Sequence, residues 1–387
     1  MLRTAALGVI PLKIHNIMKV VLAFDSFKGS LDAFSAVNAV ARGITRVLPE
    51  TDVVLCPVAD GGEGTVKILT KAACGRMLTA TVHGPLIDSV TAKWGLLDDN
   101  KTAILEMAEA AGLPLVEAER RDPTRTTSYG LGELIMNALD AGAQRIIIGL
   151  GGSATNDGGT GMAEALGVRF PGSDSPMTGG RLLDIASIDM SNIDERIKEV
   201  SFQVALDVSN PLLGPQGAAH VFAPQKGATP AQVDLLERGL SHLASLFPRV
   251  SPNLAGGGAA GGLGWGLTAF VDAELKSGID LCLDTVDFED LASNADLVIT
   301  GEGLLDQQTL QGKVPLGVAR RATAMNIPTI FLSGDHNVSL ADLEAYGVIG
   351  CYSICKDLNV SKERSIAEAS VLLEDLAVKA ISKFRKK

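Results

Sequence analysis

Short aliphatic segments that alternate with helical segments constrain the fold of this chain more than any other feature. Near the N-terminus, 19–24 (KVVLAF) and 52–59 are expected to be strands, and the segments that follow them, 31–48 and 65–73, are expected to be helices. The C-terminal third repeats this order, with strands expected at 295–300, 327–334 and 347–354 and helices at 313–325, 340–346 and 366–383. Alternation of this kind predicts a Rossmann-like, doubly wound parallel sheet.

The middle of the chain does not continue this alternation. The segments 77–86 and 89–97 have the pattern of a β-hairpin, and 168–284 mixes strands, loops and a helix at 231–247. Because 387 residues exceed what one core usually holds, we expect two domains. We assign 18–76, 122–167 and 285–387 to the Rossmann-like domain, 77–121 and 168–284 to a second α/β domain inserted into it, and 1–17 to an N-terminal extension. The cleft between the two domains is the expected ligand site.

Composition narrows the classes of partner. The chain carries 34 basic and 45 acidic residues, a net charge of −11 and no run of lysine or arginine, which argues against binding nucleic acid. The long uncharged span 250–271 is too rich in glycine to be a membrane helix, so we expect no membrane association. The five cysteines have no metal-binding spacing and are expected to be reduced thiols of a cytoplasmic protein.

Four loops share one form, in which an aliphatic strand is followed by acidic residues and glycines and then by a helix. They are 24–30 (FDSFKGS), 59–65 (ADGGEGT), 151–161 (GGSATNDGGTG) and 300–309 (TGEGLLDQQT). In one parallel sheet these loops would meet at the carboxyl ends of the strands, where such sheets bind ligands. Bare glycine backbone can approach a phosphate, and clustered carboxylates call for Mg²⁺. The acidic residues expected at this edge are Asp25, Asp60, Glu63, Asp157, Glu302 and Asp306.

These features also have a purely structural interpretation. A single Asp-Gly after a strand usually forms a turn or caps a helix. The glycine run at 255–266 (AGGGAAGGLGWG) fits a phosphate-binding backbone and close helix packing equally well. Lys28 and Lys226 each stand beside a glycine, where a lysine either meets a phosphate or lies on the surface.

Several common catalytic signatures do not occur in the sequence. The five histidines are scattered and form no HExxH, so zinc hydrolysis and nucleophilic triads are disfavoured. The sequence has no Walker A motif, and neither VAIK nor HRD of the protein kinases occurs. A dinucleotide-dependent dehydrogenase would have GxGxxG after the first strand, where this chain has DSFKG.

Taken together, seven segments resemble the bacterial glycerate kinase family. They are AFDSFKGSL, PVADGGEGTV, RDPTRTTSYGLGELI, IIIGLGGSATNDGGTGM, VALDVSNPLLGPQGAAHVFAPQKGA, GGGAAGGLGWGL and LVITGEGLLDQQTLQGKVPLGVA, and they follow one another in the family's order. The resemblance implies two α/β domains, one inserted in the other, and ATP- and Mg²⁺-dependent phosphorylation of D-glycerate, typically to 2-phosphoglycerate. A kinase of another small hydroxy acid or polyol is the alternative, and the oligomeric state stays open, a homodimer included.

For phosphoryl transfer we assign roles to the polar residues of these segments. Asp157 is expected to accept the proton of the glycerate hydroxyl or to orient it, with Lys28 and Asp60 as further catalytic residues. The residues expected to hold Mg²⁺ are Glu63, Glu302 and Asp306. Those expected to bind the substrate are Asp25, Ser26, Ser153, Asn156, Asp207 and Asn210. Those expected to bind the nucleotide and its phosphates are Gly61, Gly62, Gly151, Gly152, Gly257, Gly258, Gly261, Gly262, Lys226 and Lys313.

Two positions depart from the pattern that the family commonly shows. Phe24 stands in place of a proline in the first of the four loops, and Leu304 stands in place of an arginine in the last. If that arginine grips a carboxylate or a phosphate, another cation must do so here, and we expect Lys313 or Arg125 to supply it.

Overall fold

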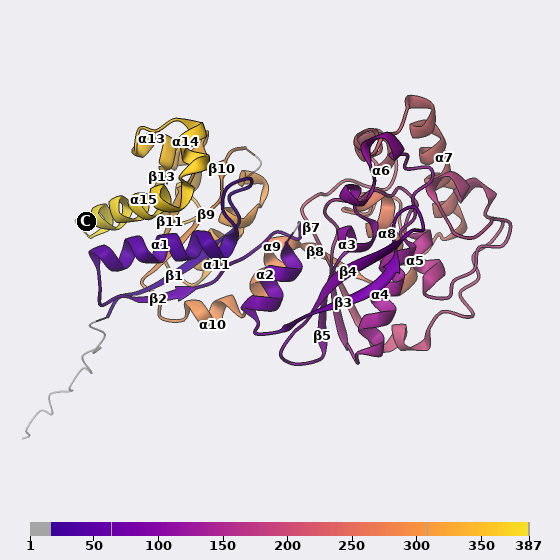
Figure 1. The fold of residues 1–387 in the computed structure, drawn as a ribbon, viewed down its shortest axis with the longest axis horizontal. Helices are drawn as coiled ribbons and strands as arrows, with labels where there is room; N and C mark the ends of the chain where they lie inside the picture. Colours follow the sequence, from indigo (N-terminus) through magenta and orange to yellow (C-terminus); the bar gives the residue numbers. More distant parts are fainter. Residues whose placement is uncertain (1–16, 63, 308, 386–387) are drawn as a thin grey trace, which may run out of the picture.

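The computed structural model describes residues 17–62, 64–307 and 309–385. The expected extension 1–17 therefore lies outside the described residues except for Ile17, and so does the expected metal ligand Glu63. The described chain forms two lobes that lie next to each other (Figure 1). We call the part built on a five-stranded sheet the first lobe, and the part built on a six-stranded sheet the second lobe.

The first lobe contains the predicted doubly wound parallel sheet. Its strands run in the order β13-β11-β9-β1-β2, and each neighbouring pair is parallel. They are β1 (Lys19–Phe24), β2 (Asp52–Leu55), β9 (Leu297–Gly301), β11 (Thr329–Ser333) and β13 (Val348–Ser353). The short strands β10 (Leu304–Leu305) and β12 (Asp335–His336), which follow β9 and β11, form a separate parallel pair.

Helices cover both faces of this sheet, which explains why its strands are apolar on both sides. The helices α1 (Ala33–Val47) and α15 (Ala369–Phe384) lie against each other on one face, and α11 (Val314–Ala324) lies on the other (Figure 1). Residues of β1 alternate between the two: Val20, Leu22 and Phe24 pack with α1 and α15, and Val21 and Ala23 pack with α11. Phe24, which replaces a proline of the family pattern, is therefore a core residue.

The second lobe carries a mixed sheet in the order β3-β4-β5-β6-β7-β8. The first two strands form the predicted antiparallel hairpin, β5 joins β4 in antiparallel pairing, and β5 to β8 are parallel. The strands are β3 (Arg76–His83), β4 (Ser89–Leu96), β5 (Thr102–Glu106), β6 (Arg145–Gly149), β7 (Ser201–Leu206) and β8 (Glu274–Ser277).

One strand lies in a different sheet from the one we expected. We assigned 122–167 to the Rossmann-like domain, but β6 pairs with β5 and β7, where Ile147 faces Ile104 and Gln203. The second sheet is thus built from one continuous stretch, 76–277, rather than from two pieces. The physical reason is that β6 is apolar on both faces, and such a strand can be buried in either sheet. Strand–helix alternation alone does not tell which sheet it joins.

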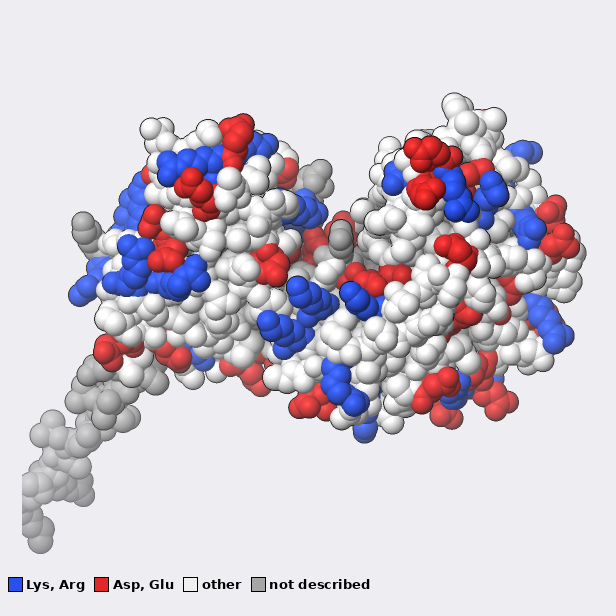
Figure 2. Space-filling view, viewed as in Figure 1, with Lys and Arg blue, Asp and Glu red and all other residues white. Residues whose placement is uncertain are grey.

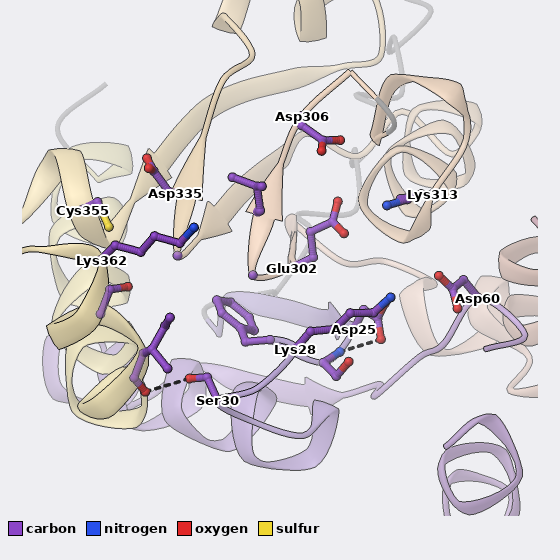
Figure 3. Close-up of a pocket in the computed structure, with 17 residues that line it drawn as sticks. Asp25, Lys28, Ser30, Asp60, Glu302, Asp306, Lys313, Asp335, Cys355 and Lys362 are labelled. Carbon is purple, nitrogen blue, oxygen red and sulfur yellow. Dashed lines mark hydrogen bonds between the residues drawn. The ribbon is translucent and has the colours of Figure 1, made fainter. Parts of the chain in front are cut away.

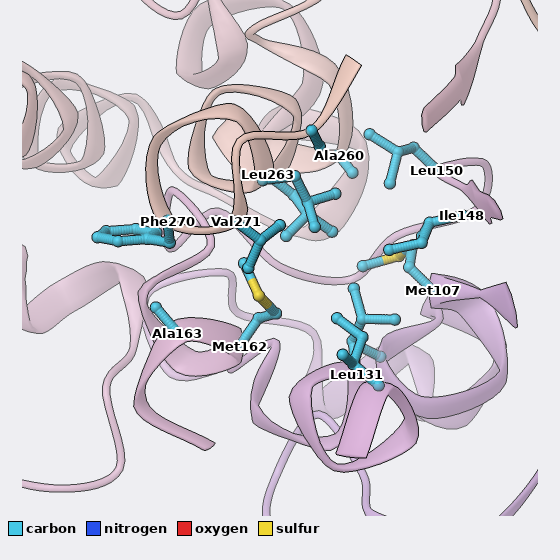
Figure 4. Close-up of a cluster of buried hydrophobic side chains, with 14 of the residues drawn as sticks. Met107, Leu131, Ile148, Leu150, Met162, Ala163, Ala260, Leu263, Phe270 and Val271 are labelled. Carbon is cyan, nitrogen blue, oxygen red and sulfur yellow. The ribbon is translucent and has the colours of Figure 1, made fainter. Parts of the chain in front are cut away.

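Helices also cover both faces of the second sheet. The helices α4 (Tyr129–Asp140), α5 (Thr160–Ala165) and α8 (Ala259–Val271) enclose a core that includes Met107, Leu131, Ile148, Met162 and Phe270 (Figure 4). On the other face, α2 (Thr65–Ala72) and α9 (Gly278–Thr285) share a buried cluster with strands of both sheets. This cluster joins the two lobes.

The two lobes contain seven further α-helices among the described residues. They are α3 (Met107–Ala111), α6 (Ala218–Phe222), α7 (Pro230–Leu246), α10 (Phe288–Ala292), α12 (Leu340–Glu344), α13 (Ile354–Asp357) and α14 (Lys362–Ala367). In the part of the chain that the structure describes, no helix has both the length and the apolar character needed to cross a membrane.

Candidate active site

The carboxyl ends of parallel strands from both sheets border one cleft. Residues after β1 and β9 line a pocket in the first lobe, and residues after β6 and β7 line a pocket in the second lobe. Figure 2 shows the molecule hollowed between the lobes, with acidic and basic side chains gathered there. The glycine-rich loops thus meet at one cleft, but they come from two sheets and not from one.

The first pocket has a volume of about 260 Å³ (Figure 3). Seven of the residues expected to bind ligand or metal line it: Asp25, Ser26, Lys28, Asp60, Glu302, Asp306 and Lys313. Among its other lining residues are Phe27, Leu304, Asp335, Cys355, Lys362 and Ile366. The pocket therefore combines carboxylates, lysines and apolar walls.

Short hydrogen bonds within the loops orient the carboxylates of this pocket. The Ser26 N–H donates to Asp25 Oδ1 (2.6 Å), and the Gly62 N–H donates to Asp60 Oδ1 (3.0 Å). The Thr309 hydroxyl donates to Glu302 Oε1 (2.7 Å). Across the pocket, Figure 3 shows Lys28 and Lys313 extending to the side where Asp25, Asp60 and Glu302 lie. Positive and negative groups are thus interleaved at one end of the pocket.

The second pocket has a volume of about 370 Å³ and lies directly beside the first. The two pockets border the same loop, because Asp60 lines the first and Gly61 and Gly62 line the second. The residues of the second pocket that we expected to bind ligand are Gly61, Gly62, Gly151, Gly152, Ser153, Asp207 and Lys226. Phe222, Gln225 and the backbone turn at Ala259 and Ala260 complete it.

Repulsion between carboxylates marks the junction of the two pockets. Burial and the charge of Asp60 raise the pKa of Asp25 to about 7. Withdrawal from water and the same Asp60 charge raise the pKa of Asp207 to about 7, against the opposing effect of Lys28 and Lys313. Burial also raises the pKa of Glu302, which its hydrogen bond from Thr309 partly offsets. Four acids from two lobes therefore interact with one another across the cleft, although Asp207 itself stays exposed.

Asp157, which we expected to be the general base, lies outside both pockets. Its side chain is fully buried and accepts hydrogen bonds from Ser128 N and Oγ (2.8 Å each), Gly159 N (3.1 Å) and Gly161 N (3.3 Å). These donors tie the starts of α4 and α5 together, so the carboxylate has a structural position. The glycines around it serve to close the loop over the acid, since a Cβ at Gly161 would lie 2.9 Å from Asp157 Oδ2.

Three other groups of expected ligand residues also lie outside the pockets. Asn156 is fully buried, and its two side-chain amide atoms have no partner among the described residues. The Asn210 amide donates to the Gln216 carbonyl (2.7 Å), which ties a loop of the second lobe. The glycines of the 255–266 run are packed against backbone, with a Cβ at Gly261 only 2.0 Å from Thr155 O and one at Gly258 2.2 Å from Pro211 O. A Cβ at Gly257 would lie 3.0 Å from Leu254 O, and one at Gly262 would lie 2.8 Å from a side-chain carbon of Leu212.

The expected replacements for the family's arginine are separated by the structure. Leu304, which stands where the family commonly has an arginine, lines the first pocket and is 43% exposed. This position therefore faces the cleft. Lys313 lines the same pocket, whereas Arg125 is exposed and lies outside both pockets. Lys362, from α14, is a further cation there, and we did not predict it.

Some residues of the site could have been found from the sequence, and others could not. Gly334 and Asp335 follow β11 directly, which repeats the strand–glycine–acid form of the four loops. Lys362 and Ile366 reach the pocket only because α14 packs beside the first loop, where the Ser30 hydroxyl donates to the Ile366 carbonyl (3.1 Å). No local pattern announces a contact between residues so far apart in the chain.

Comparisons with known proteins agree with this architecture. The sequence model described as "Glycerate kinase family" matches residues 20–385. The chain is 48% identical over 344 residues to a protein of Bacillus subtilis named glycerate kinase, covering 87% of this chain and 90% of the relative. It is 44% identical over 353 residues to a protein of Escherichia coli named glycerate 2-kinase, covering 89% of this chain and 93% of the relative.

A solved structure extends the likeness to the whole fold. A crystal structure from Salmonella typhimurium LT2, provisionally described as a glycerate kinase 2, has a TM-score of 0.83 and 43% sequence identity, covering 96% of this chain and 99% of that one. Sequence motifs, the two-lobed architecture and these likenesses point the same way, and the chain belongs to the glycerate kinase family.

Proposed function

We propose that this chain transfers the γ-phosphoryl group of ATP to the 2-hydroxyl of D-glycerate, with Mg²⁺ bound, to give 2-phosphoglycerate and ADP. The observation that carries the proposal is the junction of the two pockets, where Asp25, Asp60 and Asp207 face one another beside Lys28 and Lys313. The relative named glycerate 2-kinase supports the choice of the 2-hydroxyl. Phosphoryl transfer needs this kind of site, because its catalysis is mainly positioning and neutralisation of charge.

Asp207 takes the role of general base that we first gave to Asp157. It belongs to the second lobe, it lines the second pocket, and its pKa is raised to about 7. That value applies without a cation, and Mg²⁺ at Asp60 would lower it. What favours Asp207 in the complex is its position, because its carboxylate is open to the cleft and accepts no hydrogen bond from the described residues. Asp207 would therefore take the hydroxyl proton of the acceptor as the new oxygen–phosphorus bond forms.

The lysines of the junction would hold the phosphates. Lys28 follows β1 and Lys313 precedes the first turn of α11, and both lower the pKa of Asp207 through their charge. A cation placed there can attract the transferred group and the leaving ADP without any rearrangement at the moment of reaction.

Mg²⁺ fits the donor chemistry of the first pocket. Asp25, Asp60 and Glu302 offer the oxygen ligands that this ion prefers, and their mutual repulsion falls when a cation binds. Among the described residues, no group of three or more acidic, histidine or cysteine side chains is arranged to hold a metal ion by itself. The ion would then be held partly by water and by the nucleotide phosphates, as Mg²⁺ usually is. When bound, it neutralises charge on those phosphates.

Product analysis tests the proposal. The chain is incubated with ATP, MgCl₂ and D-glycerate, and ³¹P NMR distinguishes 2-phosphoglycerate from 3-phosphoglycerate. We expect 2-phosphoglycerate and ADP in equal amounts, loss of turnover in EDTA and recovery with excess Mg²⁺. Formation of 3-phosphoglycerate would contradict the choice of hydroxyl, and full turnover in EDTA would contradict the need for the ion. No transfer to D-glycerate, with transfer to another hydroxy acid, would contradict the acceptor.

A further inference from the structure

We propose that the second pocket is the acceptor subsite and that the buried ammonium group of Lys226 binds the carboxylate of the hydroxy acid. This inference rests on the proposed kinase function and assigns one of its two substrates to one of the two pockets. It changes the role that we first gave to Lys226, Gly151 and Gly152, which was to bind the nucleotide phosphates.

Lys226 is buried in an unusual way for a lysine. Only 2% of its surface is exposed, yet it lines the second pocket, and its Nζ donates one hydrogen bond, to the Thr155 carbonyl (2.6 Å). An ammonium group has three N–H donors, so two of them have no acceptor within the described part of the chain. A buried ammonium group with unpaired N–H donors lowers the stability of the folded chain unless a ligand supplies the missing acceptors.

The protein anion whose charge acts on Lys226 already accepts other hydrogen bonds. The charge of Asp157 favours the protonated form of Lys226, but burial outweighs this effect and lowers the lysine pKa to about 7. Both oxygens of Asp157 accept hydrogen bonds from the Ser128 and glycine donors described above. No ion pair between Lys226 and a carboxylate occurs among residues 17–62, 64–307 and 309–385. An anion bound in the pocket would supply what the fold does not.

The rest of the second pocket suits a small carboxylate with hydroxyl groups. Ser153 is 9% exposed, and its hydroxyl has no hydrogen bond to any described residue. Gly151 and Gly152 are exposed beside it, and because they have no side chains a ligand can approach their backbone. Gly152 has a φ of +74°, a conformation that favours glycine at this position. The one acidic residue that lines the described part of this pocket is Asp207, on the side toward the first pocket.

The chemistry of the first pocket, rather than its volume, assigns the nucleotide to it, since the first pocket is the smaller of the two. Lys28, Lys313 and Lys362 can contact the phosphates of a nucleotide, and Phe27 and Ile366 offer apolar surface for a base. The acids of this pocket outnumber its lysines, which suits a nucleotide that arrives with Mg²⁺. A single buried lysine in the second pocket matches a monoanion. This division places the acceptor hydroxyl near Asp207 and the terminal phosphate near Lys28 and Lys313, on the two sides of the Asp60–Gly62 loop.

The test measures binding of each substrate to the full chain and to Lys226→Met. Calorimetry with D-glycerate, in the absence of nucleotide, should show affinity reduced by about 30-fold or more, the effect of removing one partner of a buried charged contact. D-Glyceramide, the uncharged amide of the same acid, should bind the variant and the unchanged chain within about threefold of each other, and so should ATP with Mg²⁺. Lys198→Met, which removes an exposed lysine of the second lobe, is the control for net charge.

Each other outcome contradicts the inference. Equal weakening of D-glycerate and D-glyceramide would mean that Lys226 only supports the fold. Weakened binding of ATP with unchanged binding of D-glycerate would mean that the second pocket holds phosphates. If Lys226→Met does not show cooperative thermal unfolding, Ser153→Ala decides: we expect D-glycerate affinity to fall about tenfold, and an unchanged affinity would overturn the inference.

The proposed function and this inference can fail separately. A chain that binds D-glycerate through Lys226 but transfers no phosphate to it contradicts the function and leaves the subsite standing. A chain that phosphorylates D-glycerate, and whose affinity for it is the same in Lys226→Met, contradicts the subsite alone.

Discussion

Asp157 and Asp207 follow neighbouring strands of the same sheet, yet they have opposite environments. Asp157 follows β6, is fully buried and accepts four hydrogen bonds from its own lobe. Asp207 follows β7 and is exposed at the cleft, where the surrounding walls remove part of its water; this partial desolvation and the charge of Asp60 raise its pKa to about 7. Asp157 thus connects the starts of α4 and α5, whereas Asp207 interacts with charged groups of the opposite lobe.

The difference shows what decides the role of an acid after a strand. Both aspartates stand in segments rich in small and polar residues, but only Asp157 is followed by glycines that fold back over it. Those glycines turn their N–H groups onto the carboxylate, and Ser128 supplies the remaining donors. An acid whose hydrogen bonds are filled by the fold is poorly placed to accept a proton from a substrate. Replacing each aspartate by asparagine, which removes the charge and keeps the size, tests this difference.

The largest effect is expected for Asp207→Asn. Loss of the general base should lower kcat about 10²–10⁴-fold. The unfolding free energy should not fall, and at pH 8 without divalent cations it should rise by at most about 1 kcal/mol, because the raised pKa makes the ionised form of Asp207 costly in the folded chain, as for Asp25, while its exposure to solvent screens the effect. Steady-state kinetics and chemical denaturation of the same preparation check both numbers. Near-normal kcat would show that Asp207 is not the base.

Asp157→Asn should show the reverse pattern. In asparagine an NH₂ group replaces one of the two accepting oxygens, so N–H donors of Ser128 and the glycines would face another donor. We therefore expect the unfolding free energy to fall by about 2–4 kcal/mol. The kcat of the folded fraction should stay within about threefold of the parent chain, since the residue lies outside both pockets. A hundredfold loss of kcat with unchanged stability would restore Asp157 as the catalytic acid–base group.

A smaller and pH-dependent effect is expected for Asp25→Asn, measured without divalent cations. The folded pKa of Asp25 is about 7, above the ordinary 3.8, so between these values the folded chain holds a proton that the unfolded chain has released. This contribution to stability is therefore lost as pH rises from about 4 to about 7. Asparagine does not titrate, so Asp25→Asn should be more stable than the parent chain at pH 8, by about 1–3 kcal/mol, and not at pH 4.

The outcome for Asp25 sharpens the comparison with Asp157. Burial raises the pKa of both acids, but among the described residues Asp157 has four hydrogen bonds to lose and Asp25 has one. Replacing Asp25 should therefore stabilise the chain at pH 8, whereas replacing Asp157 should destabilise it at the same pH. Thermal unfolding of the two asparagine variants at pH 4 and pH 8 measures this. Destabilisation by Asp25→Asn at pH 8 would show that Asp25 is held by structural contacts in the way that Asp157 is.

Much of this arrangement could be predicted from the sequence, and the failures have common causes. The first sheet, its helices and the hairpin follow from local periodicity, as do the acids after β1, β2 and β9. The sheet to which β6 belongs could not be predicted, because its Ile-Ile-Ile segment suits any buried parallel strand. The burial of Asp157 and the packing of the 255–266 glycines could not be predicted either, because they depend on contacts with Ser128, Thr155 and Pro211 that only the tertiary structure creates.

The central claim is that the two substrates occupy the two pockets and react at their junction. A crystal structure with D-glycerate, Mg²⁺ and a non-hydrolysable ATP analogue tests it most directly. We predict the nucleotide in the first pocket with its phosphates at Lys28 and Lys313, the glycerate carboxylate on Lys226 Nζ, and the acceptor hydroxyl within hydrogen-bond distance of Asp207. Nucleotide phosphates on Lys226 and Gly151–Gly152, or an acceptor hydroxyl beside Asp157, would contradict the account.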